Sequence, residues 1–89
     1  MKEKNLKVYL YRVESLKVEL RIYAFNKKQA NELIELYKKQ NGKKAEFVKA
    51  SYTKNDIQQM KIMVERFGSE QVLVDKQYEA VKMLKKEAK

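Results

Sequence analysis

The sequence predicts an α+β domain in which a small, mostly antiparallel sheet of three or four strands carries about three helices. Two neighbouring segments near the N-terminus alternate apolar and polar residues, three later segments space apolar residues as helices do, and both glycines follow a helical segment. The expected order is β-β-α-β-α-(β)-α. A hairpin followed by a helix and a strand is typical of an antiparallel sheet, and 89 residues fit one domain spanning residues 1–89.

The two alternating segments, residues 6–11 and 16–23, are expected to pair as a hairpin with a turn near residues 13–15. Their period of two is typical of strands that bury one face. The residues expected on the core face are Leu6, Val8, Leu10, Leu16, Val18, Leu20 and Ile22.

The first helix is the most clearly marked element. Asn26 is a suitable N-cap with Gln29 as its capping-box partner, and Gly42 suits the position just after the helix. Between them, one helical face carries the apolar residues Ala30, Leu33, Ile34 and Tyr37.

The rest of the chain predicts a third strand over residues 45–52 and two further helices. Thr53 or Asn55 is expected to cap the second helix, which ends at Gly68. Residues 72–74 are apolar and fit a short fourth strand or an apolar loop. Asp75 is then expected to cap a final helix, whose apolar face is Tyr78, Val81 and Leu84.

The composition removes most catalytic chemistry. The chain has no Cys and no His, so cysteine nucleophiles, disulfides and histidine bases or metal ligands are absent. Two glycines 26 positions apart cannot build a phosphate-binding loop, and neither Asp lies in a recognisable calcium loop. We therefore expect a non-enzymatic protein with no cofactor and no metal. No apolar run approaches a membrane span, which favours the cytoplasm.

The chain is strongly basic, with a net charge of +9. Residues 1–44 hold twelve Lys and Arg against five Glu, a balance of +7. This asymmetry favours polyanions, either nucleic acid or an acidic protein surface. Lysines outnumber arginines 18 to 3, which also fits the composition bias of an AT-rich genome.

The second face of the predicted sheet has two interpretations. Aromatic and cationic residues would gather there if it stayed open, and bases could stack on the rings while cations neutralise phosphates. If the C-terminal helices covered this face, the tyrosines would become core instead. The residues concerned are Lys7, Tyr9, Tyr11, Lys17, Glu19, Arg21 and Tyr23, with Phe47 and Lys49 joining them if Val48 and Ala50 point inward.

A second basic cluster surrounds Gly42. Lys38, Lys39, Lys43 and Lys44 bracket one turn, where they can contact phosphates without reading sequence. The alternative is an ordinary solubilising loop whose charges suit a helix C-terminus.

The sequence thus supports two functional hypotheses. The first is a nucleic-acid-associated protein, in which Tyr9, Tyr11 and Tyr23 add stacking if their face is open. The cations expected to contact phosphates are Lys7, Lys17, Arg21, Lys38, Lys39, Lys43 and Lys44. The alternative is a protein-interaction module, such as an adaptor or inhibitor of a larger complex, and the composition resembles that of small phage or mobile-element accessory proteins. A self-associating protein is a variant of this alternative, and the oligomeric state stays open. An open tyrosine face continuous with the basic turn would favour nucleic acid.

Overall fold

A computed structural model describes residues 6–83 of the chain. The elements follow in the order β1 (Lys7–Val13), β2 (Leu20–Ala24), α1 (Lys27–Asn41), β3 (Ala45–Ser51), α2 (Lys54–Phe67) and α3 (Glu70–Met83). The strands form one antiparallel sheet in the order β2-β1-β3. The predicted α+β class is therefore confirmed, with the order β-β-α-β-α-α.

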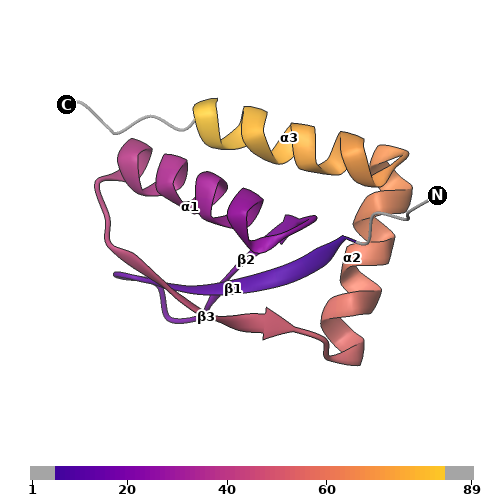
Figure 1. Cartoon of the computed structure of the whole chain (residues 1–89), viewed down its shortest axis with the longest axis horizontal. Coiled ribbons are helices and arrows are strands. Elements are labelled where there is room, and N and C mark those ends of the chain that lie inside the picture. The colour runs from indigo at the N-terminus through magenta and orange to yellow at the C-terminus, as the bar shows by residue number, and fades with distance from the viewer. Residues whose placement is uncertain (1–5, 84–89) are drawn as a thin grey trace.

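Figure 1 shows how the helices surround this sheet. α1 lies along one face, α3 runs beside α1 and also contacts β2, and α2 stands across one end of the sheet and contacts β1 and α3. β1 is the middle strand, so its two neighbours β2 and β3 are the edges of the sheet.

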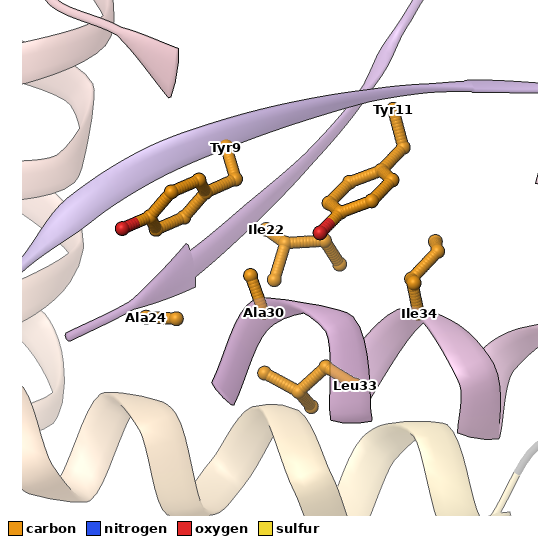
Figure 2. Packing of buried hydrophobic residues seen from close by; sticks show 7 residues of the cluster. All are labelled: Tyr9, Tyr11, Ile22, Ala24, Ala30, Leu33 and Ile34. Carbon is orange, nitrogen blue, oxygen red and sulfur yellow. The ribbon is translucent and has the colours of Figure 1, made fainter. Parts of the chain in front are cut away.

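Side chains from both faces of β1 are buried. Tyr9 and Tyr11 point toward α1 and form one core cluster with Ile22, Ala24, Ala30, Leu33 and Ile34 (Figure 2). Alternate residues of the same region contribute to a second cluster with the last two helices, made of Leu6, Val8, Leu10, Met60, Leu73 and Val74. Five consecutive residues of β1, from Val8 to Arg12, therefore include only one exposed side chain, that of Arg12.

The predicted core face of the hairpin is wrong in its second half. The register places Ile22 opposite Tyr9 and Leu20 opposite Tyr11, so these apolar residues share the tyrosine face. β2 begins only at Leu20. Leu16 and Val18 lie in the preceding loop and are exposed, Val18 by 72%. The error has a physical cause: when both faces of a strand are buried, leucine and tyrosine are equally suitable core residues, and the pattern does not fix the register.

The predicted ends of α1 are confirmed. The Asn26 side chain accepts a hydrogen bond from the Gln29 N–H at 2.8 Å, and the Gln29 side chain accepts one from the Phe25 N–H at 2.8 Å. Gly42 takes the left-handed conformation, with φ 63°, that an L side chain adopts only with strain. α2 begins after Thr53, whose hydroxyl accepts the Asp56 N–H at 3.1 Å, and ends at Gly68. The alternative cap, Asn55, lies inside the helix.

The prediction for the last segment is wrong in two respects. Residues 72–74 belong to α3 rather than to a fourth strand or a loop, and Asp75 lies inside that helix. The N-terminal cap is Ser69, whose hydroxyl accepts the Val72 N–H at 3.2 Å. Leu73 and Val74 are buried because they enter the second core cluster, a tertiary packing effect that local sequence does not show. Leu84 lies outside the described residues.

Two side chains of the helices reach the edge strands. Asp56 of α2 accepts hydrogen bonds from Arg21 of β2, at 2.6 Å, and from the Ser51 hydroxyl of β3. Gln77 of α3 bonds both backbone groups of Tyr23 in β2: its side-chain oxygen accepts the N–H at 2.9 Å, and its amide donates to the carbonyl at 2.5 Å. Over residues 6–83, the structure contains no helix that could span a bilayer.

Candidate functional site

Tyr9 and Tyr11, the proposed stacking residues of β1, lie in the core. They are only 6% and 2% exposed, and the Tyr11 hydroxyl donates a hydrogen bond to the Asn31 side chain at 2.7 Å. Burial raises the pKa of both phenols above 10.0. Their rings are covered by α1 (Figure 2) and are not available for stacking. The face is therefore covered, but by α1 and not by the last two helices as that interpretation expected, because α2 and α3 pack on the opposite face of β1.

The other residues assigned to that face are also dispersed. Arg21 pairs with Asp56, and Tyr23 is half-buried against the second core cluster. Lys7 donates to the Phe25 carbonyl at 3.4 Å. Lys17 is exposed in the loop between β1 and β2. These side chains therefore do not form one surface with the tyrosines.

The hydrogen bonds around Asp56 support the fold. The Ser51 hydroxyl and then the Arg21 guanidinium hold the pKa of Asp56 below its ordinary value, so the carboxylate stays ionised at neutral pH. Asp56 is 4% exposed, and all of its close polar neighbours bond to it or cap its helix. The network joins both edge strands to the first turn of α2.

The basic turn between α1 and β3 is bonded to the rest of the chain on both sides. The Gly42 N–H donates to the Lys38 carbonyl at 2.7 Å. On its far side, the Glu14 N–H donates to the Lys44 carbonyl at 2.9 Å, and the Lys44 N–H donates to the Glu14 carboxylate at 3.1 Å. The hairpin turn thus holds the lysine turn in position.

The lysines of this turn differ in what they contact. Lys38 pairs with Glu35 at 3.1 Å, and nearby Arg12 pairs with Glu46 at 3.4 Å. Within residues 6–83, the side chains of Lys39, Lys43 and Lys44 form no ion pair. Two of them line a shallow depression, whose walls are Glu32, Glu35, Leu36, Lys38, Lys39 and Lys43. Three unpaired ammonium groups therefore remain around one turn.

An exposed aromatic group lies along β3. Phe47 is 39% exposed and packs edge-on against Tyr11, with the ring centroids 5.6 Å apart. The Lys27 ammonium lies 3.8 Å from the centre of the Phe47 ring, and Tyr52, directly after the strand, is 68% exposed. The expected grouping of Phe47 with the tyrosines holds, but Lys49 lies opposite Leu10, on the other face.

The separation of Phe47 from Lys49 follows from a bulge. Tyr11 lies opposite Phe47 and Leu10 opposite Lys49, which leaves Val48 as an extra residue in β3. A bulge puts two successive side chains on one face and breaks the alternation. The uneven alternation of residues 45–52 was the only signal of it in the sequence. Nothing in the sequence indicated that Lys27 would lie over the Phe47 ring or that Tyr52 would be exposed directly after the strand.

The described part of the chain shows no group of three or more His, Cys, Asp or Glu placed to hold a metal ion. No protein-family model, curated protein sequence or solved structure matches the chain.

Proposed function

We propose that this protein is a non-enzymatic binding protein of the cytoplasm that contacts nucleic-acid phosphates without reading sequence. The observation that supports this best is the group of Lys39, Lys43 and Lys44 around Gly42, which are unpaired in the described structure. In a chain of net charge +9, none of these three ammonium groups forms an ion pair within residues 6–83, although Glu32 and Glu35 line the same depression as Lys39 and Lys43. A binding role suits the chain better than catalysis, because it has no His or Cys and Asp56 is already bonded to Arg21 and Ser51.

The burial of the tyrosines makes the proposal more specific. With Tyr9 and Tyr11 in the core, binding rests on phosphate contacts and not on base stacking at those rings. Such contacts release counterions, and three of them predict a slope of about −2 to −3 for log K against log salt. The same contacts do not distinguish base sequences.

A salt titration of the full chain against a fluorescent DNA duplex and an RNA strand tests this proposal. The combined variant Lys39→Gln, Lys43→Gln and Lys44→Gln is expected to bind weakly and to flatten the salt slope. A control of equal charge, Lys28→Gln, Lys54→Gln and Lys61→Gln, removes three exposed lysines of the first turn of α1 and of α2. Inorganic polyphosphate should displace the nucleic acid from the unaltered protein.

Two results would contradict the proposal. Equal losses in the two triple variants would show that overall charge matters and that the turn is not a site. Absence of salt-dependent binding by the unaltered chain at low ionic strength would remove the nucleic-acid function altogether.

The second candidate, a protein-interaction module, is supported by a different observation. The outer edge of β3 is open in the described structure, and the charges beside it select a particular partner.

A further inference from the structure

We propose that the outer edge of β3 docks an extended acidic segment of a partner protein, which joins the sheet as a fourth strand. This interaction shares Lys43 and Lys44 with the proposed phosphate contacts, but it also uses the backbone of β3, which those contacts do not involve. It follows from the direction of backbone groups, the charges beside the strand and the exposed rings at its edge.

The backbone direction can be derived from the β2 side. Both backbone groups of Tyr23 bond to Gln77 and so point away from β1. Tyr23 pairs with Val8. In an antiparallel pair, when the N–H and carbonyl of one residue point away from the partner strand, those of the residue opposite also point away. The backbone N–H and carbonyl of Val8 therefore point toward β3, where Ser51 is its partner. One pair further on, Tyr9 and Ala50 turn away from each other, so the Ala50 N–H and carbonyl face outward.

The other end of β3 gives the same result independently. The Glu14 N–H donates to the Lys44 carbonyl at 2.9 Å, so Lys44 points toward β1. Because the direction alternates along a strand, the backbone groups of Ala45 and Phe47 point away from β1 and those of Glu46 point toward it. The outward groups of Ala45, Phe47 and Ala50 have no hydrogen-bond partner within residues 6–83. An edge of this kind is a template for a further strand.

The charges beside β3 favour an acidic partner. From residue 43 to residue 54 the chain carries Lys43, Lys44, Lys49 and Lys54 against Glu46 alone. Glu46 already pairs with Arg12. A carboxylate on the added strand would meet lysines at both ends of β3. A second copy of this chain is disfavoured, because two such edges bring like charges together, which destabilises strand pairs.

The exposed rings provide side-chain contacts for the added strand. Phe47 lies on the α1 face of the sheet with Lys27 above its ring, and Tyr52 is exposed just beyond the strand. An apolar residue of the partner can pack on Phe47, and a neighbouring carboxylate can reach Lys27. Main-chain bonds then give affinity, while these contacts select the sequence.

The test uses a short synthetic peptide that alternates Glu with Val, and a control peptide that alternates Lys with Val. Calorimetry measures binding to the full chain, and amide hydrogen exchange locates it. The acidic peptide is expected to bind and to slow exchange at Phe47 and Ala50, while Tyr23 stays unchanged. Ala50→Pro removes one outward donor and should weaken binding roughly tenfold. Ala50→Ser keeps that donor and is the matched control.

The proposal is overturned if the acidic peptide fails to bind, or binds without slowing exchange at Phe47 and Ala50. It is also overturned if those two amides become protected without peptide as protein concentration rises, which would make the occupant a second copy. The proposal is likewise overturned if inorganic polyphosphate slows exchange at Phe47 and Ala50 as much as the acidic peptide does, because the edge would then respond to charge alone. If Ala50→Pro unfolds the chain, exchange in the unaltered protein decides. This readout is independent of phosphate binding by Lys39, Lys43 and Lys44.

Discussion

The outer backbone of β2 is covered by a helix side chain, whereas the outer backbone of β3 faces outward without a partner in the described structure. Gln77 of α3 bonds the N–H and the carbonyl of Tyr23 as a neighbouring strand would. At β3, the corresponding groups of Phe47 and Ala50 have no such bond. β2 carries Arg21, which is bonded to Asp56. The lysines in and beside β3 form no ion pair within residues 6–83.

This difference separates the edge of the sheet that contributes to stability from the edge that is proposed to bind a partner. The β2 edge is used to attach the C-terminal helix, so its hydrogen bonds contribute to stability. The β3 edge carries a bulge and several lysines, features that discourage pairing with identical edges. The same lysines attract an acidic strand. Stability and binding are thus assigned to opposite edges of one small sheet.

The largest expected effect is at Asp56, which joins both edge strands to α2. Asp56→Ala removes the acceptor of the Arg21 and Ser51 hydrogen bonds and leaves the Ser51 hydroxyl buried without a strong partner. We expect a loss of about 2–3 kcal/mol in the free energy of unfolding, since Arg21 is partly exposed and remains hydrated. Urea denaturation measures this loss. An unchanged midpoint would show that the edges are not joined through this carboxylate.

Acid should weaken the same link. The pKa of Asp56 is lower in the folded protein than its ordinary value of 3.8, so its contribution to stability is present above that value. It is lost as the pH falls through the folded pKa. Urea midpoints measured across the acid range should therefore decline less steeply for Asp56→Asn than for the unaltered chain. Parallel curves would mean that other carboxylates govern acid unfolding.

A smaller effect is expected at the covered edge. Gln77→Leu removes both bonds to Tyr23 and leaves its backbone groups without partners beside a half-buried ring. The expected cost is about 1–2 kcal/mol. Gln58→Ala, on an exposed position of α2, is the control and should change little. Equal losses in the two variants would indicate that Gln77 does not support the β2 edge.

The smallest effect is expected at the open edge. Lys49 is exposed and forms no ion pair among residues 6–83. Lys49→Gln should change the free energy of unfolding by less than about 0.5 kcal/mol. Thermal melting at low and moderate salt measures this. A loss comparable to that of Gln77→Leu would mean that the β3 edge also contributes to stability.

Some of this architecture was predictable from sequence because its signals are local. Asn26, Gln29 and Gly42 fix the ends of α1 by short-range hydrogen bonds and backbone conformation. By contrast, the register of Ile22 opposite Tyr9 depends on α1 covering that face. The helical state of residues 72–74 depends on the burial of Leu73 and Val74 against Met60.

Among the candidate functional surfaces, too, local features were predictable from sequence and tertiary ones were not. The basic cluster around Gly42 is local in sequence. The structure places Lys38, Lys39 and Lys43 around one depression, whereas Lys44 lines another beside the hairpin turn. Whether Tyr9 and Tyr11 are exposed is a tertiary property that alternation left open, and the structure buries both. The open edge of β3 depends on strand order, which no short segment determines.

Amide hydrogen exchange in the isolated protein can distinguish a covered β2 edge from an open β3 edge. The Tyr23 amide should be protected because it donates to Gln77, and those of Lys49 and Ser51 because they face β1. The Phe47 and Ala50 amides should exchange far faster than their neighbours. Equal protection at Phe47, Lys49, Ala50 and Ser51, or rapid exchange at Tyr23, would contradict the account.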